Sequence, residues 1–298
     1  MADRPDVVLI AGPTAGGKSA LAIARALALD GVVVNADSMQ VYEGLRIVTA
    51  RPDTDDLATV PHRLYGHVSP ERSHSVARWL DEAAECLAGT REAGRVPVFV
   101  GGTGLYFSAL VNGISDIPEP EADIRKHWRQ KGLENPQTLH VELARRDPEA
   151  AAQLRPSDVQ RLIRALEVFD STGKSILQFH RESASQSLLA GARIEAHLVS
   201  PARAELHQRI NHRFDLMIKA GALGEVEALL ARNLPEHLPV MKAIGVPQLA
   251  AHVAGKISLE TAVERAKAAS RQYAKRQSTF FRNQMTHVFD NVPPESGI

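Results

Sequence analysis

One turn has the residue types and spacing of a phosphate-binding loop: Gly12-Pro13-Thr14-Ala15-Gly16-Gly17-Lys18-Ser19. It follows a short apolar run and precedes a helix-like segment, which is the context that the pattern G-x-x-x-x-G-K-[ST] requires. Gly12 and Gly17 allow backbone N–H groups to face an oxyanion, and the following helix adds its positive N-terminal end. Lys18 supplies a full charge and Ser19 a hydroxyl suited to Mg²⁺. The alternative is a glycine-rich helix start without a ligand, which the strand, the spacing and the Lys-Ser pair together make the weaker interpretation.

A carboxylate follows a second apolar run. Asp37, with Ser38 beside it, comes shortly after the valines at 32–34. A carboxylate at the end of a buried strand can bind Mg²⁺ or act as a general base. The alternative is a helix N-cap, because Asp and Ser are both good capping residues. The phosphate-binding loop favours the chemical role.

A third polar turn, Gly101-Gly102-Thr103-Gly104, follows the apolar run at 96–100. Most P-loop NTPases end such a strand with an Asp that helps to hold Mg²⁺. Here the turn offers the Thr103 hydroxyl and no carboxylate. Its glycines can serve a tight strand–helix connection, but three in four residues favour close approach of a ligand. The sequence therefore predicts a phosphate site without the usual hydrolysis machinery.

The elements that must position these turns alternate between strand-like and helix-like runs. This alternation predicts an α/β fold of the P-loop NTPase type, with a parallel sheet flanked by helices. The carboxyl ends of parallel strands gather ligands, so the three turns are expected to converge on one crevice. The strands are expected at 7–11, 32–34, 96–100 and 193–200, and the main helices at 21–29, 75–93, 201–219, 222–231 and 259–284.

The middle of the chain differs from its ends. From about residue 116 to 190, prolines separate short charged helical segments, and no β-rich run occurs before about Ile194. We expect a catalytic core made of residues 1–115 and 191–298, with an all-helical insertion at 116–190.

Composition favours a soluble cytoplasmic protein. The 298 residues include 35 basic and 35 acidic side chains, so the net charge gives no indication of a nucleic-acid partner. The first strand begins too early to leave room for a signal peptide, and no apolar run is long enough to span a membrane. The single cysteine, Cys86, is expected to be a buried small hydrophobe. His62, His67 and His74 show no compact metal-ligand spacing, and we expect surface or packing roles for them.

Local basic patches point to a polyanion. Between Arg265 and Arg282 there are six Lys or Arg residues and no Asp or Glu, and Arg271, Lys275 and Arg282 share one helical face. A face of one charge sign repels itself unless a partner neutralises it, which favours RNA or DNA over a merely solvated face. Arg155, Arg161 and Arg164 form a second patch in the predicted insertion.

Taken together, these motifs resemble the bacterial tRNA dimethylallyltransferases, which prenylate the adenosine just 3′ of the anticodon. The resemblance runs nearly end to end. It rests on GPTAGGKS (12–19), ADSMQVY (36–42), GGTGLYF (101–107), QRLIRALEV (160–168), AIG (243–245) and SRQYAKRQSTFFR (270–282). In that family the loop holds the diphosphate of dimethylallyl diphosphate rather than ATP, which suits the missing Asp after the third strand.

The resemblance implies roles for individual residues. Asp37 would accept the proton of the adenine amine, Thr103 would orient the amine or the diphosphate, and Lys18 and Arg213 would stabilise the departing diphosphate together with Mg²⁺ on Ser19. The helical insertion would grip the anticodon stem, and the protein would act as a monomer without a membrane partner. The residues expected to contact tRNA are Asp37, Ser38, Met39, Gln40, Thr103, Arg125, Gln160, Arg161, Leu162, Ile163 and Arg164, joined on charge grounds by Arg271 and Lys275.

Three other functions remain open at this point. An ATP-dependent small-molecule kinase also uses a P-loop, but it needs no basic stripe at 265–282. A free-adenylate isopentenyltransferase would accept AMP in place of tRNA. A nucleotide-gated RNA-binding protein would keep its full function without the Asp37 carboxylate.

Overall fold

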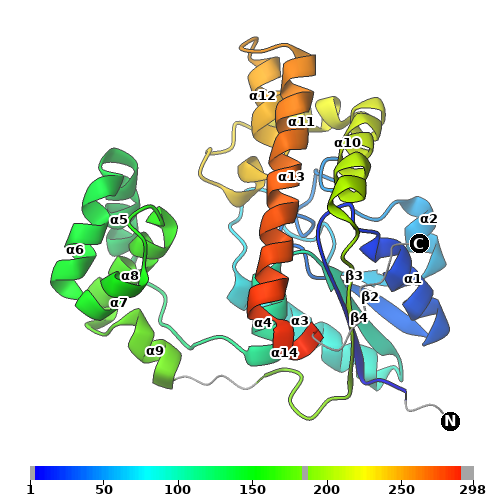
Figure 1. The fold of residues 1–298 in the computed structure, drawn as a ribbon, viewed down its shortest axis with the longest axis horizontal. Helices are drawn as coiled ribbons and strands as arrows, with labels where there is room; N and C mark the ends of the chain where they lie inside the picture. Colours follow the sequence, from blue (N-terminus) through cyan, green and yellow to red (C-terminus); the bar gives the residue numbers. More distant parts are fainter. Residues whose placement is uncertain (1–3, 183–186, 290–298) are drawn as a thin grey trace. The chain divides into compact units, whose positions relative to one another are not determined.

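The computed structural model describes residues 4–182 and 187–289, and it separates into two compact units (Figure 1). The first unit combines the residues up to Val111 with those from Leu188 on, and the second spans Asn112–Ser187. These boundaries lie three or four residues before the predicted ones, since 111 and 187 stand against 115 and 190. Residues 1–3, 183–186 and 290–298 of the predicted ranges lie outside the described part of the chain.

The first unit is built on a five-stranded sheet with the order β3-β2-β4-β1-β5, and every strand pair is parallel. The predicted parallel sheet is confirmed. The additional edge strand β3 was not predicted, because two polar residues give no apolar run. The strands are β1 (Val7–Ala11), β2 (Gly31–Asn35), β3 (His62–Arg63), β4 (Val96–Gly101) and β5 (Ile194–Leu198).

The sheet order brings the three polar turns together. β4 lies between β2 and β1, and parallel pairing puts the carboxyl ends of all three on one edge. The turns that follow β1, β2 and β4 carry the phosphate-binding loop, Asp37 and Thr103. The fold therefore places the candidate site where ligands bind in open parallel sheets.

Helices cover both faces of this sheet (Figure 1). Alternate residues of each strand face opposite ways: Val8 packs with Ala22 and Ala26 of α1, whereas Leu9 belongs to the larger core that contains Trp79 of α3. The helices of this unit are α1 (Lys18–Ala28), α2 (Thr54–Thr59), α3 (Val76–Glu92), α4 (Gly104–Asn112), α10 (Arg203–Lys219), α11 (Ala222–Leu230), α12 (Val246–Val253), α13 (Leu259–Gln284) and α14 (Thr286–Phe289), with a 3₁₀ turn η2 (Pro239–Lys242).

The longest helix, α13, is specified by its cap and by small residues. Ser258 accepts a hydrogen bond from the Thr261 N–H at 3.1 Å and starts the helix. Its buried positions recur every three or four residues, and several of them are Ala or Ser, which lets the helix approach its neighbours closely. They are Ala262, Ala266, Lys267, Ser270, Ala274, Gln277 and Phe281.

The second unit is helical throughout the residues that the structure describes. Its core is centred on Trp128, which is fully buried among Leu143, Leu162 and Leu166. Asp147 caps α7 by accepting from the Ala150 N–H at 3.1 Å. The helices are α5 (Ala122–Glu134), α6 (Leu139–Arg146), α7 (Pro148–Gln153), α8 (Val159–Thr172) and α9 (Ile176–Glu182), with a 3₁₀ turn η1 (Pro136–Thr138).

The described helices that are long are also rich in polar residues. Across residues 4–182 and 187–289, none combines the length and the apolar character needed to cross a bilayer.

Candidate active site

The turn after β1 has the backbone of an anion-binding loop. Gly12 and Gly17 have φ angles of 148° and 102°, which side-chain-bearing residues rarely adopt, and Gly17 precedes the first turn of α1. A Cβ on Gly12 would lie 2.4 Å from the Val199 carbonyl oxygen, so the turn also needs glycine for space. Ser19 is exposed in the first turn of α1, where an oxyanion would meet the helix N-terminus.

Lys18 is held inward by its own loop. Its Nζ donates to the Pro13 carbonyl at 2.7 Å. Burial lowers the pKa of Lys18 to about 8, the Asp37 carboxylate opposes this shift, and the Arg213 guanidinium adds to it. An ammonium stripped of water in this way gains strongly from a bound anion.

Two arginines of α10 reach the same turn. Arg213 Nη2 donates to the Thr14 hydroxyl, and Arg209 Nη1 donates to the Gly16 carbonyl at 3.4 Å. Burial lowers the pKa of Arg213 to about 10, and the Asp37 carboxylate acts in the opposite direction. Arg213 therefore stays charged at neutral pH and is aimed at the phosphate-binding loop.

Asp37 lies on a turn and not at a helix start. The segment between β2 and α2 forms turns, so the N-cap alternative is not what the structure shows. Buried Asn35 fixes the backbone here: its Oδ1 accepts from the Asp37 N–H at 2.8 Å and its Nδ2 donates to the Asp37 carbonyl at 3.0 Å. Asp37 Oδ1 accepts from the Met39 N–H at 2.9 Å. The carboxylate is thereby held in one orientation at the cavity described below.

Thr103 supports the Asp37 turn directly. Its hydroxyl accepts from the Ser38 N–H at 3.0 Å and donates to the Ser38 hydroxyl at 3.3 Å. Burial raises the pKa of Tyr273, which the Asp37 carboxylate raises further, and hydrogen bonds with Thr103 and Gln277 oppose the shift. These contacts place Thr103 and Tyr273 beside Asp37.

The glycines after β4 make room for protein and not for a ligand, which corrects the sequence interpretation. A Cβ on Gly102 would lie 1.9 Å from Nε2 of Gln277, and one on Gly104 would lie 2.0 Å from a ring carbon of Phe280. A Cβ on Gly101 would lie 2.1 Å from the Ala36 carbonyl oxygen. Gly102 and Gly104 therefore allow α13 to pack closely, and Gly101 allows close packing of Ala36, the residue after β2.

Gln277 joins the two glycine-rich turns. This buried side chain accepts from the Thr14 N–H at 2.8 Å and donates to the Gly102 carbonyl at 2.9 Å. One amide of the phosphate-binding loop is therefore already satisfied by the protein. A basic face was predicted for α13, but nothing in the sequence pattern indicated that a glutamine of this helix would order the loop.

Asp37, Thr14 and Arg213 line a cavity of about 240 Å³ in the first unit, whereas Lys18, Ser19 and Thr103 are not among its lining residues. Its lining combines polar and charged groups, including Asp37, Thr14 and Arg213, with apolar side chains. The lining also holds two cations, Lys242 and Arg276, so basic groups outnumber the single carboxylate. The apolar lining consists of Met39, Val48, Ile210, Phe214, Met217, Ala243 and Ile244, and Ser38, Thr49, Ser270 and Tyr273 complete the cavity.

Several of the residues that line the cavity were not predicted to be site residues. Phe214 and Met217 read as ordinary core positions of a helix, and Lys242 stood outside every charge cluster. The Ala243-Ile244-Gly245 motif was a usable signal, because Ala243 and Ile244 line the cavity. Gly245 has a φ of 101°, which lets the chain turn at this wall.

The predicted tRNA-contacting residues of the second unit differ in exposure. The Arg161 side chain is 74% exposed, Gln160 is exposed, and Arg125 and Arg164 are half-buried. Arg125 Nη2 donates to Glu119 Oε1 at 2.9 Å. Ile163 is half-buried, whereas Leu162 is fully buried in the core. The expectation for Leu162 is corrected accordingly, because its side chain supports α8 from inside.

The predicted basic stripe on α13 is less uniform than the sequence indicated. Lys267 is buried and paired with Asp215 at 2.8 Å and Glu264 at 2.9 Å, so acidic neighbours in space neutralise it. Arg271 Nη1 donates to Asn211 Oδ1 at 2.5 Å. Lys275 remains exposed, as does Arg282.

Gln40 was predicted to contact tRNA, whereas no chemical role was predicted for Cys86, His67 and His74. Gln40 Nε2 donates to the Thr49 and Ala50 carbonyls at 2.8 and 2.9 Å, which closes the loop that carries part of the cavity wall. Cys86 is half-buried, and burial raises the pKa of its thiol, which does not suit a nucleophile. His67 and His74 were expected to have surface or packing roles, but the fold brings both onto one carboxylate.

Family models and named relatives of this chain agree on one family of transferases. The family model described as IPP transferase matches residues 40–284, and one described as isopentenyl transferase matches residues 5–71. The chain belongs to the IPP transferase family. A protein of Rhizobium meliloti named tRNA dimethylallyltransferase is 50% identical over 288 residues, covering 96% of this chain and 95% of that protein. One of Rhizobium johnstonii with the same name is 51% identical, covering 96% and 97%.

Solved structures of the family have the same fold. The tRNA isopentenylpyrophosphate transferase of Bacillus halodurans is 34% identical with a TM-score of 0.66, over 94% of this chain and 88% of that one. A eukaryotic dimethylallyltransferase described as acting on tRNA is 27% identical with a TM-score of 0.80, over 94% and 71%.

Proposed function

We propose that this chain transfers a dimethylallyl group from dimethylallyl diphosphate to the exocyclic amine of the adenosine 3′-adjacent to the anticodon in tRNA. The observation that carries this proposal is the shared cavity: Asp37, the apolar side chains of Phe214 and Met217, and Thr14 and Arg213 of the diphosphate side all line the same space. An allylic diphosphate needs both kinds of surface, and the acceptor amine needs the base.

The exocyclic amine of adenine is a weak nucleophile, so the reaction depends on the leaving group and on proton removal. The amine lone pair forms the new N–C bond while the electron pair of the allylic C–O bond leaves with the diphosphate. Lys18, Arg213 and the loop amides stabilise the charge that develops there. Asp37 accepts the proton released by the amine. Phe214 and Met217 hold the five-carbon group away from water.

Mg²⁺ is the proposed cofactor. Ser19 presents an exposed hydroxyl at the end of the phosphate-binding loop, and a hydroxyl together with diphosphate oxygens is the all-oxygen donor set that Mg²⁺ prefers. When bound there, the ion would neutralise charge on the departing diphosphate.

An ATP-dependent kinase is the weaker proposal for a specific reason. β4 ends in Gly101, and the turn after it is occupied by α13 side chains and carries no carboxylate for a nucleotide-bound metal. The deciding experiment mixes the protein and Mg²⁺ with unmodified tRNA and either labelled dimethylallyl diphosphate or labelled ATP. We expect prenylated tRNA and free diphosphate without ATP. Phosphorylation that requires ATP would overturn the proposal, and prenylation of AMP in preference to tRNA would replace it with the free-adenylate activity.

The second unit is proposed to bind the anticodon stem through α8, chiefly through its exposed Arg161. Arg161→Ala should weaken tRNA binding and reduce the slope of log Kd against log salt by about 1, as expected for one lost phosphate contact. Arg181→Ala is the matched control: Arg181 lies in the same unit, is also exposed and has an acidic partner in Glu149, as Arg161 has in Asp158, but it is not assigned to tRNA. An unchanged salt slope for Arg161→Ala would contradict the assignment.

A further inference from the structure

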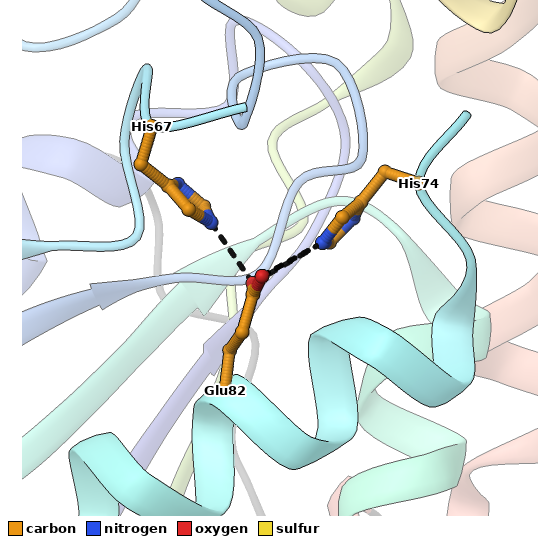
Figure 2. Close-up of side chains that lie close together, drawn as sticks. All are labelled: His67, His74 and Glu82. Atoms are coloured by element: carbon orange, nitrogen blue, oxygen red, sulfur yellow. Dashed lines mark hydrogen bonds and ion pairs between the residues drawn. The ribbon is translucent and has the colours of Figure 1, made fainter. Parts of the chain in front are cut away.

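Two histidines and one carboxylate converge outside the candidate active site (Figure 2). His67 and His74 lie on the loop between β3 and α3, and Glu82 lies two turns into α3. His67 Nε2 lies 2.9 Å from Glu82 Oε2, and His74 Nε2 lies 3.1 Å from the same oxygen. The three potential donor atoms all lie within 4.8 Å of one another.

We propose that His67, His74 and Glu82 form a binding site for a transition-metal dication of the zinc type. Two imidazoles with one carboxylate are a donor set typical of Zn²⁺, whereas Mg²⁺ and Ca²⁺ favour oxygen donors alone. Both imidazoles present Nε2 to the same point, and Figure 2 shows the two rings approaching the carboxylate from opposite sides. The site is distinct from the cavity that holds Asp37, because none of the three residues lines that cavity.

The spacing suits tetrahedral coordination. Zn–N and Zn–O bonds of about 2.0–2.1 Å place neighbouring donor atoms roughly 3.3 Å apart. The two nitrogen–oxygen separations of 2.9 and 3.1 Å need a few tenths of an ångström of expansion, and the two imidazole nitrogens, which lie within 4.8 Å of each other, must take up the same spacing. Three protein donors leave the fourth position for water, and His67, whose side chain is 31% exposed, opens the site to solvent.

His74 has the environment of an oriented metal ligand. Its side chain is only 4% exposed, and its second ring nitrogen, Nδ1, lies 3.5 Å from the Tyr106 hydroxyl. Tyr106 is itself fixed by stacking on Trp79 with ring centroids 4.2 Å apart. When the ion takes Nε2, the ring proton moves to Nδ1 and can be donated to that hydroxyl. Such a partner fixes the tautomer and the ring plane of a coordinating histidine.

The site would stabilise a wall of the candidate active site. The His67 N–H donates to the Val41 carbonyl at 2.9 Å, and the His74 N–H donates to the Tyr42 hydroxyl at 3.2 Å. Val41 and Tyr42 continue the segment that carries Asp37 and Met39. An ion on the histidines would therefore join α3 to the loop behind the catalytic carboxylate, and its role would be structural.

The test measures metal binding and not prenyl transfer, so it is independent of the proposed function. Metal-stripped full-length protein is dialysed against micromolar Zn²⁺ with excess Mg²⁺, and bound zinc is counted per chain by mass spectrometry. We expect one zinc per wild-type chain, a rise in melting temperature on zinc addition, and a tetrahedral visible absorption spectrum when Co²⁺ replaces zinc. Glu82→Gln and His67→Ala should each weaken binding at least tenfold. His67 is partly exposed, so its replacement is compatible with folding, which circular dichroism verifies.

Two controls separate this site from other zinc ligands. His237→Ala removes an exposed histidine elsewhere in the same unit, and Cys86→Ser removes the thiol one helical turn beyond Glu82. Both variants should keep the zinc and the cobalt spectrum. The proposal is overturned if wild-type protein binds no zinc under these conditions. It is equally overturned if Cys86→Ser loses the ion while Glu82→Gln keeps it.

Discussion

The two glycine-rich turns at the ends of β1 and β4 look alike in the sequence but differ in what fills them. At the turn at 12–19, the Lys18 ammonium and the Arg213 guanidinium donate to Pro13 and Thr14 of the loop, and Thr14 and Arg213 line the cavity. The turn at 101–104 is filled by Gln277 and Phe280 of α13. Glycine allows close approach in both places, but only the charges around a turn show whether the approaching group is a ligand or another part of the protein.

The two turns also depend on each other. Gln277 accepts from Thr14 of the first turn and donates to Gly102 of the second, so α13 sets the shape of the loop that meets the diphosphate. The second turn in return positions Thr103, which supports the Asp37 turn. The filled turn thus orders the open one, and the following predictions test this division of roles.

The largest effect is expected at the carboxylate beside the open turn. Asp37→Asn keeps the shape and the hydrogen bond to Met39 but removes the base, so we expect the single-turnover rate of prenyl transfer to fall by about 10²–10⁴. The tRNA Kd should remain close to wild type. A rate within about threefold of wild type would exclude Asp37 as the base.

The next largest effect is expected in the open turn itself. Lys18→Ala removes the principal cation for the leaving diphosphate, and we expect kcat to fall by about 10²–10³. Melting temperature should fall little, because the hydrogen bond that the ammonium donates goes to its own loop. If the variant kept kcat but lost stability, Lys18 would have a structural role, and the turn at 12–19 would not differ from the turn at 101–104 in the way described.

A substitution in the turn at 101–104, which side chains of α13 fill, should change the stability of the protein. In Gly104→Ala the new methyl group meets the Phe280 ring, and we expect the free energy of unfolding to fall by about 1–3 kcal/mol, measured by denaturant titration. Gly89→Ala is the matched control, since this glycine is exposed within α3 with nothing near its Cβ. That variant should gain about 0.5–1 kcal/mol. If Gly104→Ala were as stable as wild type and lost only substrate affinity, its turn would be a ligand site after all.

The smallest effect concerns pH. Burial lowers the pKa of Lys18 to about 8, so the free protein loses this positive charge as pH rises through that value. The affinity for dimethylallyl diphosphate should therefore fall by roughly tenfold between pH 7 and 9, measured by calorimetry. Lys18→Arg keeps its charge over this range and should give a nearly flat profile. The same fall in both proteins would assign the pH dependence to another group.

The sequence was sufficient for four of the five strands, the long helices and the phosphate-binding loop, because these depend on local periodicity and on a motif with its own backbone geometry. Asp37 was proposed as the base because it follows a strand, but the support of its turn by Thr103 depends on a contact between separate strand ends. Phe214 and Met217 could not be recognised, since a cavity wall and a core position have the same residue types. The burial of Leu162, the ion pairs of Lys267 and the convergence of His67 and His74 on Glu82 could not be predicted for the same reason. Each depends on which residues meet after folding.

The most direct test of the central claim is a crystal structure of the complex with an unreactive analogue of dimethylallyl diphosphate and a tRNA anticodon stem-loop. The account predicts the diphosphate on the turn at 12–19 beside Lys18 and Arg213, and the five-carbon group against Phe214 and Met217. The adenine amine should lie within hydrogen-bond distance of Asp37. A diphosphate bound elsewhere, or an amine too far from Asp37 for even one bridging water, would contradict it.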